Sequence, residues 1–202
     1  MAQIGRPREF DTNDALDKAV EVFWRQGYEG TTLMDLTRAM GISKPSLYSA
    51  FGSKEETFKK ALTRYARVDM AYVDDALAEP TAFDVASHYL NANVAAVTTP
   101  GKPAGCLSIQ GGLSSSTEDR SVIDFLNASR ADAADRFTAR FTRAQNEGDL
   151  ASEETPADLA AYVTTVSAGI AVQAASGSSR EQLLRVASRA LLAFPRTARA
   201  VG

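Results

Sequence analysis

Apolar residues recur at helical spacing along most of this chain of 202 residues. Residues at i, i+3, i+4 and i+7 share one face of an α-helix, which a core then covers. The first such segment, over residues 12–26, shows this spacing in Leu16, Ala19, Val20 and Phe23. Glycines and prolines end or begin each segment. Later segments are expected at 54–77, 82–97, 105–116, 119–147, 156–175 and 179–194. The sequence therefore predicts an all-α fold of about nine helices.

Two short helical segments meet at a glycine between residues 31 and 52. Gly41 ends the first segment, Ser43 is a natural N-cap for the second, and Gly52 ends the second. A glycine-bearing turn between two short helices is the helix-turn-helix pattern, whose second helix enters the DNA major groove, about 12 Å wide. The outer face of the second helix is small and polar, as that role requires. An ordinary helical hairpin with a solvated face shows the same pattern, so the residues alone leave both interpretations open.

The chain begins with a short basic tail. Arg6 and Arg8 flank Pro7, and no acidic residue precedes Glu9. Basic arms of this kind reach into the DNA minor groove, although a solvated terminus has the same composition. The net charge of −3 does not exclude DNA, because the charge is uneven. Residues 1–64 hold ten Lys or Arg against nine Asp or Glu, whereas residues 65–202 hold twelve against sixteen.

Catalytic and metal sites have few residues to draw on. His88 is the one histidine and Cys106 the one cysteine, so an intrachain disulfide is excluded. A zinc site takes about four ligands, and no GxGxxG or GxxxxGK[ST] phosphate-binding motif occurs. We therefore predict no enzymatic activity, no metal and no cofactor. A cysteine-dependent enzyme, with Cys106 as nucleophile and His88 as base, stays as an alternative.

The apolar runs are too short for a membrane-spanning helix. None approaches the ~20 residues that such a helix needs, and the N-terminus lacks the apolar core of a signal peptide. A single cysteine is usual in a reducing compartment. These observations predict a cytoplasmic protein with no membrane partner.

Four segments in the first third of the chain carry a family resemblance. They are Gly-Arg-Pro-Arg-Glu-Phe-Asp (5–11), Gly-Tyr-Glu-Gly-Thr-Thr (27–32), Met-Gly-Ile-Ser-Lys-Pro-Ser-Leu-Tyr (40–48) and Phe-Gly-Ser-Lys-Glu-Glu (51–56). In order and separation they closely resemble the TetR/AcrR-type transcriptional regulators. Beyond residue 65 the resemblance rests on helix lengths and on Ala-Gly-Cys-Leu (104–107). That element looks like one in a subgroup that carries Gly-Cys-Leu in the ligand-binding region.

The resemblance implies a domain organisation and a function. We expect a basic arm at 1–10, a three-helix DNA-binding domain with the helix-turn-helix at 11–53, and a helical ligand-binding and dimerisation domain at 54–202. The implied function is that of a homodimeric transcriptional repressor. It binds double-stranded DNA sequence-specifically at a near-palindromic operator, and a small-molecule effector releases it. The last two helices are expected to form the dimer interface. A transcriptional activator of the same family, or a redox or electrophile sensor acting through Cys106, are alternatives.

The resemblance also implies which residues contact DNA. The minor groove or its phosphates are expected to meet Arg6 and Arg8. Phosphates are expected to meet Thr32, Tyr48 and Lys54, the last from a helix start whose free N–H groups favour an anion. Base edges in the major groove are expected to meet Ser43, Lys44, Pro45 and Ser46.

The resemblance also implies a ligand cavity, bounded by the helices expected from residue 54 to residue 175. Its candidate lining residues are Tyr65, His88, Tyr89, Asn91, Cys106, Gln110, Phe125 and Tyr162. For any one of these residues, ordinary core packing is the alternative and the more common explanation. Cys106 is accordingly either a sensor or a buried structural thiol.

Overall fold

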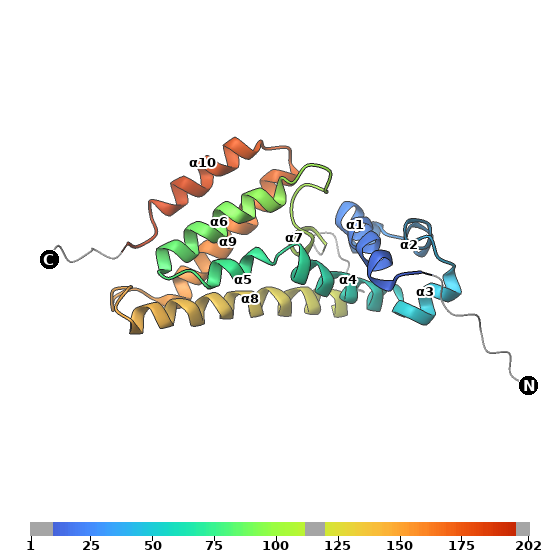
Figure 1. The fold of residues 1–202 in the computed structure, drawn as a ribbon, viewed down its shortest axis with the longest axis horizontal. Coiled ribbons are helices and arrows are strands. Elements are labelled where there is room, and N and C mark those ends of the chain that lie inside the picture. Colours follow the sequence, from blue (N-terminus) through green and yellow to red (C-terminus); the bar gives the residue numbers. More distant parts are fainter. Residues whose placement is uncertain (1–9, 112–119, 197–202) are drawn as a thin grey trace, which may run out of the picture.

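The computed structural model describes residues 10–111 and 120–196, which form ten α-helices and no strands (Figure 1). In chain order these are α1 (Thr12–Gly30), α2 (Leu33–Met40), α3 (Lys44–Phe51), α4 (Lys54–Val68), α5 (Tyr72–Leu77), α6 (Ala82–Val97), α7 (Leu107–Gln110), α8 (Arg120–Asn146), α9 (Pro156–Ala175) and α10 (Arg180–Leu191). The predicted all-α fold is confirmed. Arg6 and Arg8, the predicted arm residues, lie outside the described residues.

The helix expected over residues 54–77 is divided into α4 and α5, which raises the count from about nine to ten. The N–H groups of Asp69 and Met70 both donate to the Tyr65 carbonyl, at 2.8 and 3.2 Å, and this ends the regular α4 ladder. Beyond the break, Val73 is buried and Tyr72 stacks on Tyr89 of α6. The chain therefore turns here because α5 packs on α6 rather than continuing along α4.

Helix α1 ends its regular turns at a glycine, as the sequence predicts. Gly27 has φ +70° and ψ 177°, a backbone conformation that an L side chain rarely adopts. One further turn then carries Tyr28 back into the core. The backbone N–H of Tyr28 donates to the Gly111 carbonyl at 3.4 Å, so the end of α1 contacts the segment that follows α7.

The helix-turn-helix is formed by α2 and α3 and held by side-chain caps. Thr32 and Asp35 form a capping box at the start of α2, and Gly41 ends that helix in the left-handed conformation. The Ser43 side chain accepts from the Ser46 N–H at 3.3 Å and caps α3. The inner faces of the two helices place Leu36, Met40, Leu47 and Phe51 in the core. The angle between the helices is thereby fixed by apolar packing.

Aromatic rings join α4 to α1. The Phe58 ring meets Phe23 edge-on at 5.0 Å and Tyr28 at 5.2 Å between centroids. One turn from the far end of α4, Tyr65 meets Trp24 of α1 at 4.8 Å. All of these rings are buried, so α4 contributes to the same core as the helix-turn-helix.

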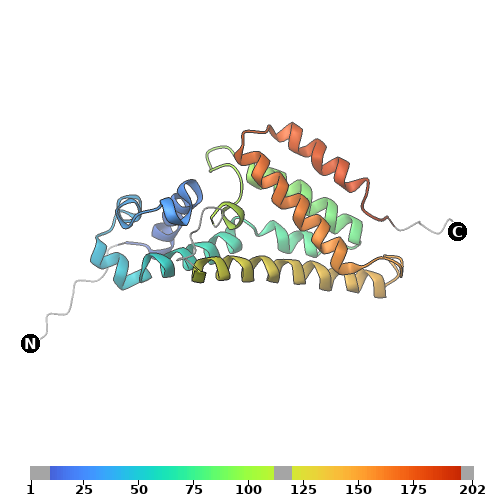
Figure 2. The same ribbon diagram turned by 180° about the vertical axis from the view of Figure 1, so that it is seen from behind.

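The remaining helices form a layered bundle. Helix α8 extends along one side of the molecule and reaches α4, while α6 packs against both α9 and α10, which also contact each other (Figures 1 and 2). The buried guanidinium of Arg140 on α8 donates to the carbonyls of Leu77, Glu79 and Pro80, which satisfies the end of α5. Across the described ranges, no helix is both long and apolar enough to span a membrane.

Candidate DNA-contacting face and ligand cavity

The first turn of α3 brings the predicted base-contacting residues together on one exposed face. Ser43, Lys44 and Pro45 are exposed, and Ser46 is half-buried beside them. The hydroxyls of Ser43 and Ser46 form a hydrogen bond of 2.8 Å, so each holds the other in position. The Tyr48 side chain is 47% exposed, and the Lys44 ammonium lies 5.9 Å from its ring centroid. This exposed face presents hydroxyl, ammonium and phenol groups.

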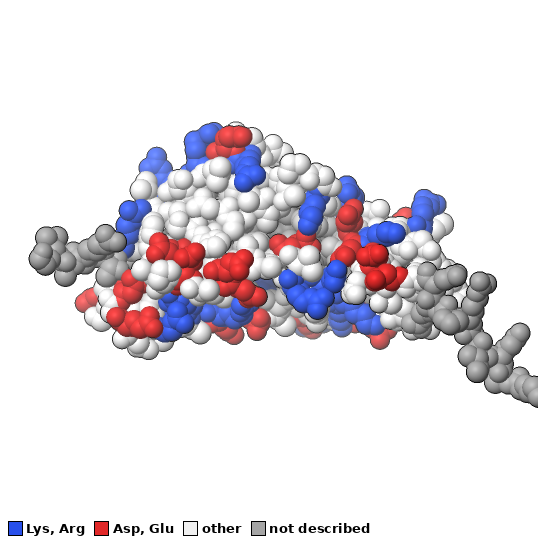
Figure 3. Space-filling model, in the orientation of Figure 1, with Lys and Arg blue, Asp and Glu red and all other residues white. Residues whose placement is uncertain are grey.

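The two other predicted phosphate contacts lie at helix starts. The Thr32 hydroxyl and backbone N–H both donate to the Asp35 carboxylate, at 2.6 and 2.9 Å. These two hydrogen bonds hold the pKa of Asp35 below its ordinary value. Thr32 is therefore primarily a cap. Lys54 begins α4, and its ammonium lies 4.3 Å from the ring centroid of Tyr28. On the face in Figure 3, acidic side chains gather toward the end opposite α1–α3, and both charges mix over α1–α4.

Lys60 is a positioning residue that sequence reasoning missed. Its ammonium donates to the carbonyls of Phe51 and Ala50, at 3.0 and 3.5 Å, and so caps the C-terminal end of α3 from α4. A lysine on a helix surface has no sequence signal for such a contact. The geometry nevertheless fixes α3 to the helix that follows it.

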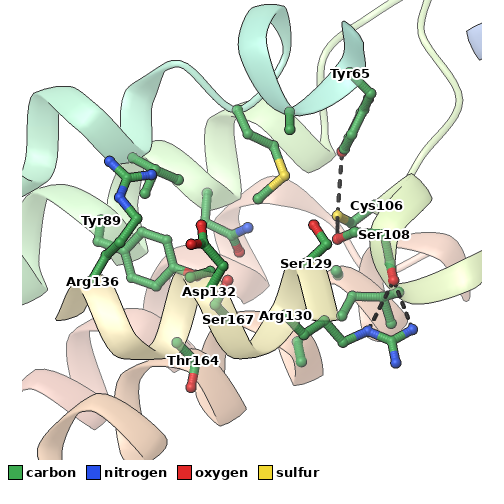
Figure 4. A pocket seen from close by; sticks show the side chains of 18 of the residues that line it. Tyr65, Tyr89, Cys106, Ser108, Ser129, Arg130, Asp132, Arg136, Thr164 and Ser167 are labelled. Atoms are coloured by element: carbon green, nitrogen blue, oxygen red, sulfur yellow. Dashed lines mark hydrogen bonds between the residues drawn. The ribbon is translucent and has the colours of Figure 1, made fainter. Parts of the chain in front are cut away.

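A cavity of about 310 Å³ lies among α4, α5, α6, α7, α8 and α9 (Figure 4). Its lining includes three of the predicted residues, Tyr65, Tyr89 and Cys106. The Cys106 side chain is 4% exposed, and its sulfur accepts from the Tyr65 hydroxyl at 3.3 Å and lies 3.0 Å from the Ser108 hydroxyl. Burial raises the pKa of Tyr65, and burial raises the pKa of Tyr89 to about 12. Both tyrosines are therefore neutral hydroxyl groups at physiological pH.

Two predicted lining residues on α6 face away from the cavity. His88 Nδ1 lies 2.8 Å from a Glu79 oxygen, and the Asn91 amide donates to the Ser87 carbonyl on the surface. Successive residues of a helix are about 100° apart, so neither shares the cavity-facing side of Tyr89. Asn93, one turn after Tyr89, lines the cavity instead. Its i, i+4 spacing from Tyr89 places it on the same side of the helix, which is the sequence signal that identifies it.

Three further predicted lining residues also lie elsewhere. Gln110 covers Gly105, where a Cβ would meet the Gln110 Oε1 atom at 2.6 Å. Phe125 lies beneath the Lys59 ammonium, and the Tyr162 hydroxyl donates to the Ala190 carbonyl at 2.8 Å. None of the three lines the cavity. Each instead packs against or bonds to a neighbouring element.

The arrangement does not assemble a cysteine–histidine pair. The contacts of Cys106 are with the hydroxyls of Tyr65 and Ser108, whereas His88 pairs with Glu79. Within residues 10–111 and 120–196, no three or more His, Cys, Asp or Glu side chains gather as a metal site would require.

Known proteins resemble the chain over different lengths. Residues 15–61 match the model of the bacterial regulatory proteins of the tetR family. The HTH-type transcriptional repressor ComR of Escherichia coli (strain K12) is 30% identical, over 95% of this chain and 92% of ComR. The repressor BdcR of the same strain is 28% identical over 92% of this chain and 90% of BdcR.

A solved structure agrees in fold along almost the whole chain. It is a cysteine-substituted variant of the TetR family transcriptional regulator CifR, complexed with 26-base-pair double-strand operator DNA. The two chains are 42% identical, with a TM-score of 0.90, over 94% of this chain and 100% of that one. Together with the match to ComR, this shows that the chain belongs to the TetR family of bacterial regulatory proteins.

Proposed function

We propose that this chain is a cytoplasmic, homodimeric repressor that binds a near-palindromic operator and is released by a small-molecule effector. One observation carries the proposal: a single helix, α4, connects the helix-turn-helix to the cavity. Helix α4 begins at Lys54, shortly after α3 ends at Phe51, and its Tyr65 lines the cavity. The repressor names of ComR and BdcR, and the operator DNA bound to CifR, support the same function.

DNA contacts are proposed for the exposed side of the helix-turn-helix. In the major groove, Lys44 donates to guanine O6 and N7, while Ser43, Pro45 and Ser46 contact neighbouring base edges. Phosphates are contacted by Thr32, Tyr48 and Lys54. The arm residues Arg6 and Arg8 follow the backbone into the minor groove.

A symmetric dimer through α9 and α10 is proposed from the surface of these helices. After its first turn, which carries the exposed Asp158, the exposed side of α9 bears small or apolar residues, namely Ala161, Thr165, Gly169 and Val172. Beside it, Val186 of α10 is also exposed, as is Leu192 at the end of that helix. Apolar surface of this kind is typical of an interface. To fit successive major grooves, such a dimer must hold its two α3 helices about 34–36 Å apart.

Release is proposed as a shift between two conformations. An effector shifts this equilibrium only through its different affinity for the two states. The cavity reaches the DNA-binding helices through α4 and through α7, since Cys106 lines the cavity and the Gly111 carbonyl accepts from the Tyr28 N–H. A change in cavity shape thereby moves α1 and α4 together with α3.

Selection of bound sequences from random double-stranded DNA tests the proposal. The full chain is expected to bind the selected duplex about 10³-fold or more tightly than random DNA, with an affinity that falls linearly in log salt. Equal affinity for both duplexes contradicts it. Deletion in the cell separates repressor from activator, because loss of a repressor raises expression of the target and loss of an activator lowers it.

A second candidate function is a sensor of electrophiles or oxidants, in a subgroup with the Gly-Cys-Leu element at 105–107. The position of the Cys106 thiol on the cavity wall supports it. Displacement of operator DNA by a soft electrophile such as N-ethylmaleimide is then expected to be lost in Cys106→Ser. Displacement that persists in this variant leaves Cys106 structural.

A further inference from the structure

The walls of the cavity that come from α4, α6, α7 and α9 carry no charged side chain. Charged lining residues come from α5 and α8, and most already have partners. Arg136 pairs with Asp74, and the Arg130 guanidinium donates to the Ser108 carbonyl and the Asn127 amide oxygen. Asp132, the remaining acid of the lining, is an exposed residue. A charge buried without a partner is strongly unfavourable, so this cavity selects an uncharged molecule.

One buried polar atom in the cavity wall lacks a partner. The Asn93 side chain is 2% exposed and lines the cavity, and its Nδ2 donates to the Tyr72 hydroxyl at 3.1 Å. Within the part of the chain that the structure describes, its Oδ1 has no hydrogen-bond partner. Buried polar groups in proteins are nearly always hydrogen-bonded, and an amide oxygen only accepts. A bound molecule that donates a hydrogen bond would therefore satisfy this atom.

The size and the remaining walls limit the molecule further. A space of about 310 Å³ is at the small end for ligand cavities and holds roughly nine to fifteen non-hydrogen atoms at protein-like packing. The walls are largely apolar, with Leu62, Met70, Val73, Ile109 and Ala171 among the lining residues. Most of the ligand surface is thus apolar, and its polar group is small.

We propose that the cavity binds an uncharged, mainly apolar molecule of this size, whose hydroxyl or N–H group donates a hydrogen bond to Asn93 Oδ1. The claim that this molecule is the effector rests on the proposed function, whereas the claim that it binds in the cavity does not. The site itself is defined by Asn93, by the apolar walls, and by the confinement of its charged lining residues to α5 and α8.

Three probes of matched size test the ligand class by calorimetry on the full chain. They are 2-phenylethanol, its methyl ether and phenylacetate, which are respectively a donor, an acceptor without a donor, and an anion. The alcohol is expected to bind about tenfold or more tightly than the ether, since a site built to hydrogen-bond a hydroxyl rejects the analogue that lacks it. Phenylacetate is expected to bind weakest. Equal binding of alcohol and ether, tightest binding of phenylacetate, or no binding of any probe at millimolar concentration overturns the proposal.

A pair of variants assigns the preference to one side chain. Asn93→Leu removes the acceptor and is expected to abolish the difference between alcohol and ether. Asn91→Leu is the control, because Asn91 lies on the same helix, is exposed and does not line the cavity. It is expected to keep the difference. If a folded Asn93→Leu protein still prefers the alcohol to the ether, the role of Asn93 is overturned. If that variant does not fold, the probe series on the unaltered chain still tests the ligand class.

Operator release separates this inference from the proposed function. Binding of the alcohol that depends on Asn93 but leaves the operator complex intact supports the ligand class and contradicts the effector role. Failure to bind any DNA sequence contradicts the proposed function, while the calorimetric preference still supports the site.

Discussion

At the scale of single residues, two lysines near α3 differ in their surroundings. Lys44 is exposed in the first turn of α3, whereas the Lys54 ammonium lies against the Tyr28 ring at the start of α4. The first position faces base edges in the proposed complex, and the second faces the backbone. Equal charges therefore serve different purposes.

Alanine at each lysine separates these roles. Lys54→Ala is expected to weaken binding to all duplexes by a similar factor and to reduce the salt slope by about 1. Lys44→Ala is expected to relax preference at particular base pairs, at a cost of ~1–3 kcal/mol. Anisotropy titrations on the selected duplex and on its single-base variants measure both effects. The assignment of Lys44 fails if the variant weakens selected and random DNA equally.

Acid pH is expected to loosen the capping boxes of α2 and α4. Hydrogen bonds from Thr32 hold the pKa of Asp35 low, and the Ser53 N–H does the same for the pKa of Glu56. A folded-state pKa below the unfolded one gives stability that is present above the unfolded value and is lost as pH falls through the folded value. The Asp35→Asn, Glu56→Gln double variant should thus show a flatter fall of Tm between about pH 5 and pH 3. Glu153→Gln, at an exposed loop residue, should keep the original slope.

At the scale of elements, Lys60 links α4 to the end of α3. Lys60→Met removes the ammonium that caps α3. It is expected to weaken binding to the selected duplex roughly three- to tenfold and to weaken binding to random DNA less. Lys59→Met is the matched control, since its ammonium bonds Glu55 and Ser121 rather than α3. A larger effect of Lys59→Met than of Lys60→Met in duplex titrations contradicts the positioning role.

Local signals in the sequence specify α2 and α3 well, and distant packing decides the rest. Ser43, Gly41 and the capping boxes act within a few residues, so their roles follow from the sequence itself. The break between α4 and α5 depends on the packing of α5 against α6, which no local pattern reports. The sequence predicts only part of the cavity lining for the same reason. Helical spacing shows that Tyr89 lies on a different side of α6 from His88 and Asn91. Which side faces the cavity depends on the helices packed against α6.

At the scale of the whole molecule, Gly169 offers a clean test of the proposed dimer. It is exposed on α9, and a Cβ placed there meets nothing within 4 Å in the subunit. Gly169→Glu should therefore leave the subunit folded but block close approach of a second copy. Light scattering is expected to show a monomer, and operator affinity to fall about a hundredfold or more. Ala131→Glu, exposed on α8, is the control and should remain dimeric. A dimeric Gly169→Glu protein contradicts this interface.

The ring of Phe58 between Phe23 and Tyr28 has a consequence for hybrid regulators. A hybrid that joins residues 11–53 to a foreign sensing domain leaves the rings of α1 without their cover from α4 and exposes apolar surface to water. The transferable unit therefore extends through α4 to Tyr65. Because Tyr65 also lines the cavity, any graft of this DNA-binding domain carries part of its own ligand-binding wall into the new host.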